Sequence, residues 1–264
     1  MTPDLRAELI ETANALADVA RRETLVHFRG GALGVENKLD GGFDPVTVAD
    51  RAAERAMRAV LAERRPDDAI LGEEYGAQAG SSGLTWVLDP IDGTRAYLSG
   101  TPTWGVLISV ADASGPVLGV IDQPFIGERF VGGLGQSSVT GPMGTRELGT
   151  CAPRPLDQAI IFTTFPEVGS ETEGRAFQDV AARCQLTRYG IDCYAYALVA
   201  AGQIDLVVEA GLQAYDIQAP IAVIEAAGGM VTNWQGGPAH EGGRVLGAAN
   251  ADIHAAALDI LKRY

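Results

Sequence analysis

The most informative stretch of this chain is Trp86-Val87-Leu88-Asp89-Pro90-Ile91-Asp92-Gly93-Thr94. Its apolar first part predicts a strand that ends on Asp89, because Pro90 cannot donate a hydrogen bond to a neighbouring strand. The turn at Pro90 allows Asp89 and Asp92 to point to one place and leaves the Ile91 carbonyl outside the sheet pairing. Oxygen atoms of these kinds are the ligands that Mg²⁺ requires. The stretch therefore predicts a cation site at the end of a strand.

The next residues, Gly93 and Thr94, predict an anion site beside that cation site. Gly93 permits the backbone to come close to an anion. Thr94 would begin a short helix through Leu98, whose first N–H groups can hold phosphate oxygens. Taken alone, Asp-Gly-Thr is more often a simple turn followed by a helix cap. The rest of the chain must decide between these interpretations.

Further acidic residues lie at junctions between apolar segments and loops. Each has an ordinary explanation as a solvated loop acid, an acid favoured by a helix dipole, or an N-cap. Open α/β folds place ligands at such junctions, which favours one shared site. These junctions carry Glu73 and Glu74 after an apolar run, Asp44, Thr47 and Asp50 near a helix start, and Asp216 before a helix predicted from Ile217.

The composition is typical of a folded protein with an acidic surface. Apolar residues make up 47% and charged residues 20% of the 264 residues, as in ordinary globular domains. The formal net charge of −14 repels nucleic acid and anionic lipid, so we expect neither as a partner. An anionic substrate then needs a bound cation. Three cysteines without CxxC spacing favour a reducing cytoplasm, and no apolar run is long enough to span a membrane.

Hydrophobic periodicity predicts two halves, residues 1–140 and residues 141–264. The first half has two amphipathic helices and then the strands of one sheet, with a hairpin turn at residues 113–116. The second alternates strands and helices, as α/β layers do. Residues 134–155 have little periodicity and form the predicted boundary. Helices are predicted at 2–30, 47–66, 94–98, 172–184, 192–201, 217–227 and 252–262, and strands at 69–71, 85–88, 104–110, 117–121, 129–131, 160–163, 204–208, 230–233 and 245–249.

Together, Gly72-Glu73-Glu74, the segment 89–94 and the late Asp216 resemble the motifs of the inositol monophosphatase superfamily, in the same order along nearly the whole chain. The resemblance implies a layered αβαβα sandwich of α+β or α/β class, a Mg²⁺-dependent phosphatase and a homodimer. Within that superfamily the chain is most similar to bacterial histidinol-phosphate phosphatases, through its segments 95–100, 120–124 and 192–196.

The resemblance also implies a role for each site residue. Two or three Mg²⁺ ions would be held by Glu73, Asp89, the Ile91 carbonyl, Asp92 and Asp216. Paired cations can activate a water and stabilise the leaving oxygen of an in-line displacement.

The implied catalytic residues are Glu73 and Thr94, which would orient and deprotonate the attacking water, and Asp50, which would hold the weakest metal through water. Glu209 would face the leaving alcohol. Residues expected to contact the substrate are Asp92, Gly93, Thr94, Arg95, Asp192, Glu209 and Asp216.

The predicted reaction is hydrolysis of L-histidinol phosphate to L-histidinol and phosphate. We hypothesise that Asp192 and Glu209 select this ester by pairing with its ammonium and imidazole groups, although surface solvation explains both acids equally well. The alternatives on the same scaffold are an inositol-1-monophosphatase and a nucleotide 3′-phosphatase. The alternative from another class is a catalytically silent homologue that binds divalent cations.

Overall fold

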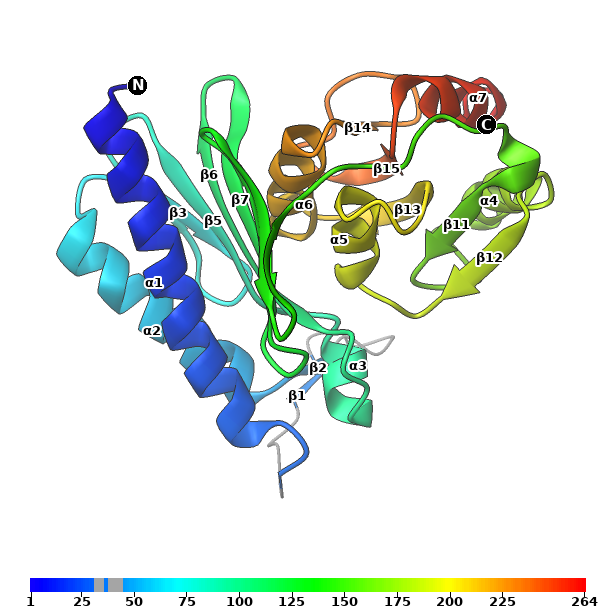
Figure 1. The fold of residues 1–264 in the computed structure, drawn as a ribbon. Helices are drawn as coiled ribbons and strands as arrows, with labels where there is room; N and C mark the ends of the chain where they lie inside the picture. The colour runs from blue at the N-terminus through cyan, green and yellow to red at the C-terminus, as the bar shows by residue number, and fades with distance from the viewer. Residues whose placement is uncertain (31–35, 38–44) are drawn as a thin grey trace.

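Two β-sheets alternate with three layers of helices in the computed structural model, which describes residues 1–30, 36–37 and 45–264 (Figure 1). Asp44 lies outside the described residues. The αβαβα sandwich predicted from the sequence is thereby confirmed. The outer layers are α1 (Pro3–His27) with α2 (Val48–Arg64) on the first sheet and α4 (Glu171–Ala181) with α7 (Ala251–Leu261) on the second, while α5 (Tyr194–Ala200) and α6 (Ala214–Ala226) lie between the sheets.

The first sheet has eight strands in the order β10-β9-β8-β7-β6-β5-β3-β4. All neighbours are antiparallel except β3 and β5, which are parallel and pair Gly72 with Leu88. The residues after these two, Glu73 and Asp89, therefore leave the same edge of the sheet. The strands are β3 (Ala69–Gly72), β4 (Gly76–Gln78), β5 (Thr85–Asp92), β6 (Gly105–Asp112), β7 (Gly115–Gln123), β8 (Glu128–Gly133), β9 (Gln136–Gly141) and β10 (Gly144–Glu147).

The second sheet has five strands in the order β12-β11-β13-β15-β14. Here β11 is parallel to both β12 and β13, and β15 is antiparallel to β13 and β14. The carboxyl ends of β11 and β13 consequently lie at one edge. The strands are β11 (Ile160–Thr163), β12 (Leu186–Tyr189), β13 (Leu206–Leu212), β14 (Met230–Thr232) and β15 (Gly243–Ala248), preceded by a short 3₁₀ helix (Leu156–Gln158). A separate two-stranded ladder joins β1 (Glu36–Asn37) and β2 (Pro45–Val46).

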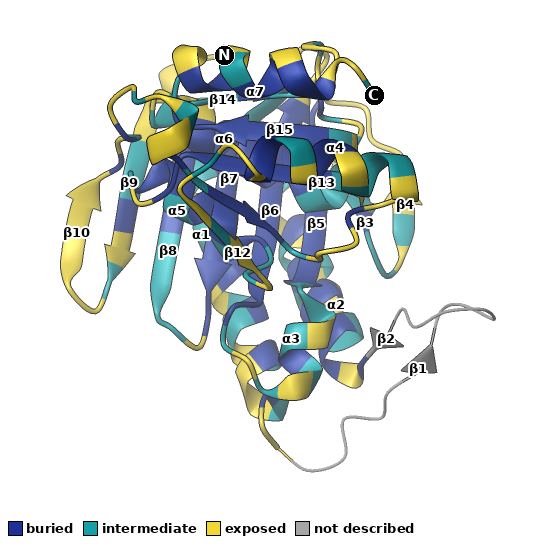
Figure 2. Cartoon of the chain, turned by 90° about the vertical axis from the view of Figure 1, so that its right-hand side faces the viewer, coloured by how far each residue is buried: buried dark blue, intermediate teal, exposed yellow. Residues whose placement is uncertain are grey.

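The apolar faces of the helices cover the sheets and leave most strand residues buried (Figure 2). Leu9 and Leu16 of α1 and Met57 of α2 pack on the first sheet together with Trp86, and all four side chains are buried. Trp86 and Trp104 are both fully buried. In the described part of the chain, no helix is both long enough and apolar enough to cross a membrane.

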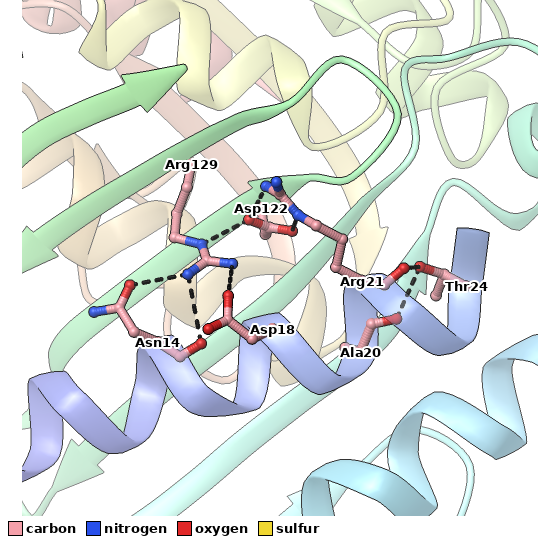
Figure 3. Close-up of polar contacts among 7 residues, drawn as sticks. All are labelled: Asn14, Asp18, Ala20, Arg21, Thr24, Asp122 and Arg129. Carbon is pink, nitrogen blue, oxygen red and sulfur yellow. Dashed lines mark hydrogen bonds and ion pairs between the residues drawn. The ribbon is translucent and has the colours of Figure 1, made fainter. Parts of the chain in front are cut away.

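A buried carboxylate ties α1 to the first sheet (Figure 3). Asp122 of β7 has no exposed side-chain surface. Arg21 of α1 donates to its two oxygens at 3.0 and 2.6 Å. Arg129 of β8 donates to Oδ1 at 2.7 Å and reaches back to Asn14 and Asp18 of α1. The negative charge of Asp122 is therefore balanced inside the chain.

The structure corrects the sequence-based elements at several places. The segment 134–155 was predicted to have little regular structure, but it contains β9 and β10, and β10 is exposed along its length. Strand β5 does not end at Asp89. It continues to Asp92 with an irregular register between these two residues. The strands β1, β2, β4 and β12 were also not predicted. The division at residue 140 stays a prediction, and the first sheet extends to Glu147.

Candidate active site

Three carboxylates meet at the edge where β5 ends. Asp89 and Asp92 come from β5 and Asp216 from the first turn of α6, and one oxygen of each lies within 4.8 Å of the others. Hard divalent cations bind such groups of oxygens. The sequence suggested Asp216 as an N-cap before a helix at Ile217, and this was wrong. The helix begins at Ala214, and Asp216 accepts a hydrogen bond from the Gln213 N–H at 2.6 Å.

A cavity of about 310 Å³ opens over this cluster. The cavity is lined by every residue predicted for the site except Asp50. The lining includes Glu73, Asp89, Ile91, Asp92, Gly93, Thr94, Arg95, Asp192, Glu209 and Asp216.

The clustered acids disfavour one another's charge. Burial first, and then repulsion from Glu73, Asp92 and Asp216, raises the pKa of Asp89 well above its ordinary value of 3.8. Burial, followed by repulsion from Asp192 and Asp216, also raises the pKa of Asp92 well above that value. A cation bound among these oxygens would remove the repulsion. The carboxylates thus fit a metal site by position, chemistry and charge.

The irregular part of β5 shapes the cluster. Its Ile91 N–H donates to Asp89 Oδ1 at 3.0 Å, which fixes the carboxylate against its own backbone. The Thr94 hydroxyl donates to the Ile91 carbonyl at 3.1 Å. A carbonyl oxygen has two lone pairs, so the Ile91 oxygen can still offer one to a cation.

Gly93 packs closely against Asp192. Its φ of 83° lies in the left-handed region, and a Cβ at this position would lie 2.6 Å from Cγ of Asp192. The absence of a side chain at position 93 therefore makes room for this carboxylate. Asp192 accepts a hydrogen bond from the Thr103 hydroxyl at 2.8 Å, and Asp92 accepts one from the Cys193 N–H at 2.6 Å.

Glu209 lies inside β13, at its irregular register, and not just after the strand as predicted. Its side chain is bound to the end of β11. The Thr164 N–H donates to Oε1 at 2.6 Å and the Thr163 hydroxyl to Oε2 at 3.1 Å. Burial, partly offset by these hydrogen bonds, raises its pKa from 4.5 to about 7. The carboxylate is thus held in a fixed position facing the cavity.

Asp50 is the predicted residue that does not line the cavity. It is buried at the start of α2, where Oδ2 accepts from the Thr47 N–H at 2.8 Å as part of a capping box. Its Oδ1 has no hydrogen-bond partner among the described residues. Burial, with a smaller contribution from Glu73, raises its pKa from 3.8 to about 6. Helix capping explains one of its oxygens and leaves the other available.

Some lining residues were missed by the sequence reasoning. Thr164 and Phe165 follow β11, and residues 210–212 form the irregular end of β13. The signal that drew attention to Asp89, a position just after an apolar strand, applies equally to Phe165. An aromatic residue at such a position is more often part of the core, so the pattern alone does not identify Phe165 as a site residue.

Comparison with known proteins gives a consistent result. The sequence matches the inositol monophosphatase family over residues 5–263. It is 38% identical to a chloroplastic bifunctional phosphatase of Arabidopsis thaliana, covering 94% of this chain and 73% of that one. It is 35% identical to a histidinol-phosphatase of Streptomyces coelicolor over 96% of both. The solved structure of an inositol monophosphatase from Zymomonas mobilis superposes with a TM-score of 0.83 at 37% identity, covering 96% of this chain and 97% of that one.

A layered sandwich with a carboxylate cluster at the strand ends defines a metal-dependent phosphatase. This chain belongs to the inositol monophosphatase family, whose members hydrolyse small phosphate monoesters.

Proposed function

We propose that this phosphatase uses Mg²⁺ and that its substrate is L-histidinol phosphate. The observation that carries the proposal is the distribution of acids around one cavity. Asp89, Asp92 and Asp216 form a compact cluster, and Asp192 and Glu209 line the same cavity. The cluster suits cations that neutralise a phosphate. The other two acids suit an alcohol that carries positive charge. The histidinol-phosphatases among the relatives support the same substrate.

The metal ligands in this proposal are Glu73, Asp89, the Ile91 carbonyl, Asp92 and Asp216, and they would hold two or three ions. When bound, the cations supply positive charge that stabilises the phosphoryl group and makes a nearby water more acidic. Orientation of the water, binding of the phosphate and recognition of the leaving group are assigned to side chains that line the cavity.

In this proposal Glu73 and Thr94 would together orient and deprotonate the attacking water, with the proton ending on the Glu73 carboxylate, and Asp50 would help to hold the weakest metal through water. Gly93, Thr94 and Arg95 hold the phosphate. Thr94 is already oriented by its hydrogen bond to the Ile91 carbonyl, which lowers the entropic cost of positioning the water.

Leaving-group recognition is assigned to Asp192 and Glu209. Both carboxylates are bound by threonine donors, Thr103 for Asp192 and Thr163 with Thr164 for Glu209. Side chains fixed in advance lose little entropy when a ligand binds. A cationic leaving group beside Glu209 would also lower the raised pKa of that carboxyl and strengthen the contact.

An ester panel tests the proposal. Purified protein is assayed for free-phosphate release with Mg²⁺ from histidinol phosphate, inositol 1-phosphate and a nucleoside 3′-phosphate, with a chelator as the control. We expect the highest kcat/KM for histidinol phosphate and loss of activity with the chelator. A higher value for either other ester assigns the protein to that activity instead. Metal binding without turnover of any ester would identify the catalytically silent homologue.

The substitution Glu209→Gln tests the leaving-group assignment. It removes the charge and keeps the shape. The amide oxygen can still accept from the Thr164 N–H, and the amide nitrogen would donate to the Thr163 hydroxyl instead of accepting from it. We expect KM for histidinol phosphate to rise roughly tenfold, the value of one charged hydrogen bond, with a much smaller change for an ester of an uncharged alcohol. Equal changes for the two esters would remove Glu209 from substrate selection.

A homodimer in a reducing compartment completes the proposal. All three cysteines are free, which suits the cytoplasm. Light scattering of the purified protein tests the dimer, since a monomer at working concentration would contradict it.

A further inference from the structure

An exposed aromatic ring forms part of the cavity wall. Phe165 is 44% exposed, lies two residues after the end of β11 and lines the cavity together with Thr164 and Glu209. Exposure of an apolar ring to water is unfavourable, and a ligand that covers the ring recovers that free energy. Neither the carboxylate cluster nor the two leaving-group acids accounts for this position.

Arg95 lies over the same ring. Its guanidinium carbon is 4.8 Å from the ring centroid, a cation–π distance. Arg95 belongs to α3 (Thr94–Ser99), next to the first sheet, whereas Phe165 follows a strand of the second sheet. The pair therefore joins the two halves at one side of the cavity, and it limits the directions in which the ring can turn.

The ring is also fixed relative to Glu209. The two residues before Phe165 donate the hydrogen bonds that hold this carboxylate. The short segment at the end of β11 thus places the Phe165 ring and the Glu209 carboxylate in the wall of the same cavity. A flat ring with N–H groups satisfies both, because its face stacks on Phe165 while an N–H group reaches an acid. A saturated ring or an open aliphatic chain has no π face to stack.

We infer that Phe165, supported by Arg95, is a specificity-determining residue that selects phosphate esters whose alcohol carries a flat nitrogen heterocycle. The inference rests on the proposed function, because it concerns the leaving group of the same reaction. It adds a preference for ring shape, which the charges of Asp192 and Glu209 do not provide.

Two esters that differ in the ring test this inference. Histidinol phosphate and leucinol phosphate share the amino alcohol and the phosphate, and only the first has an aromatic ring. We expect Phe165→Leu to raise KM for histidinol phosphate roughly three- to tenfold, the usual value of an aromatic pair, and to affect leucinol phosphate much less. Phe165→Tyr keeps the ring and should retain the wild-type ratio of the two KM values.

The chain offers a matched control in Phe125. This ring is 45% exposed and lies 4.4 Å from the Arg29 guanidinium carbon, but it does not line the cavity. Phe125→Leu should leave both KM values unchanged. Melting temperatures of the variants separate folding from recognition, and since Phe165 is exposed we expect Phe165→Leu to fold normally.

The inference is overturned if Phe165→Leu changes both KM values by the same factor or changes neither. Failure of the wild-type protein to hydrolyse histidinol phosphate would contradict the proposed substrate alone. In that case the same variants are compared on benzyl phosphate and cyclohexylmethyl phosphate, which differ only in whether the ring is flat. Loss of preference for the benzyl ester in Phe165→Leu then supports the stacking wall, and an unchanged preference rejects it.

Discussion

Two acidic groups lie on strands that flank β6, a single buried carboxylate on β7 and a cluster that begins on β5, and the chain balances their charges differently. On β7, Asp122 is bound by Arg21 and Arg129 at 2.6 to 3.0 Å. On β5, among the residues that the structure describes, no basic side chain forms an ion pair with Asp89 or Asp92. The first group has its counter-charge within the protein. The second has acidic neighbours in the described part of the chain, and a bound cation would balance their charge.

The comparison shows how a structural acid differs from a ligand-binding one when both are buried. Burial and hydrogen bonding do not distinguish them, since Asp92 also accepts a short hydrogen bond, from the Cys193 N–H. The sign of the surrounding charge does. Four experiments follow, each of which changes one of the two groups or the link between them.

The largest effect is expected from Asp92→Asn. Amide substitution keeps the shape and the hydrogen bond from Cys193 but removes a negative charge from the cluster. We expect kcat/KM with Mg²⁺ to fall by roughly a hundred- to a thousandfold, the scale for losing one preorganised electrostatic contact. The metal-free variant should nevertheless melt at a higher temperature than the wild type, since repulsion is relieved. Activity within tenfold of wild type would contradict a role in the cluster.

A loss of stability is expected from Asp122→Ala, in contrast to the gain expected for the metal-free Asp92→Asn variant. Arg21 and Arg129 would lose their shared partner, and we expect the free energy of unfolding to fall by about 2–3 kcal/mol in denaturant titrations, at the lower end for a broken buried pair because both arginines retain some exposure. The exposed pair Arg64–Glu11 gives the control, since Glu11→Ala should cost less than about 1 kcal/mol. Equal losses for the two variants would show that Asp122 is not a structural acid.

The pH dependence of stability forms a third test. Asp50 and Glu209 have their pKa values raised to about 6 and about 7 in the folded protein, and the pKa values of Asp89 and Asp92 are raised well above 3.8. A raised acid pKa stabilises the fold below the unfolded value and ceases to do so as pH rises through the folded value.

The metal-free protein should therefore lose stability between about pH 4 and pH 8, from these shifts and the linkage relation. Mg²⁺ competes with protons for the same oxygens, so its thermal shift should increase over that range, reaching several degrees at saturating Mg²⁺. Melting curves with Mg²⁺ or a chelator at several pH values measure this. A shift that is largest at the acidic end would contradict binding to ionised carboxylates.

The smallest effect is expected where the cluster meets Asp192. Gly93→Ala introduces an alanine where the backbone is in the left-handed region, and its Cβ would lie 2.6 Å from Cγ of Asp192. Gly76 also has positive φ, at 65°, but a Cβ there meets nothing within 4 Å. We expect Gly76→Ala to cost about 1–2 kcal/mol of backbone strain, and Gly93→Ala to cost more and also raise KM. Equal unfolding free energies and an unchanged KM would show that Asp192 moves aside easily.

Local patterns in the sequence predicted the helices and the central strands. Helix α1 is recognisable from Pro3 near its start and from an apolar face at helical spacing, and β5 from the run before Asp89. The β9–β10 hairpin was not recognisable, because its residues are largely polar and exposed and gain their strand structure from pairing with β8. Edge strands of this kind depend on their neighbours more than on their own periodicity.

The site was predictable only in part for a related reason. Asp89 and Asp92 lie three residues apart, so a single turn brings them together. The packing of Asp192 against Gly93 and the hydrogen bond from Thr103 to Asp192 depend on contacts between segments that are far apart in the sequence, which no local pattern encodes. The start of α6 was misplaced because its N-cap is Gln213, which is not one of the residue types that usually mark a helix start.

Helix α6 contacts both sheets and also supplies Asp216 to the cluster. The turn after β11, the Asp192 turn and residues 210–212 complete the cavity from separate segments. An exchange of these three segments between relatives would reshape the space offered to the alcohol while β5 and α6 keep their carboxylates in place. This separation makes the protein a suitable starting scaffold for laboratory evolution toward new phosphate esters by grafting short loops.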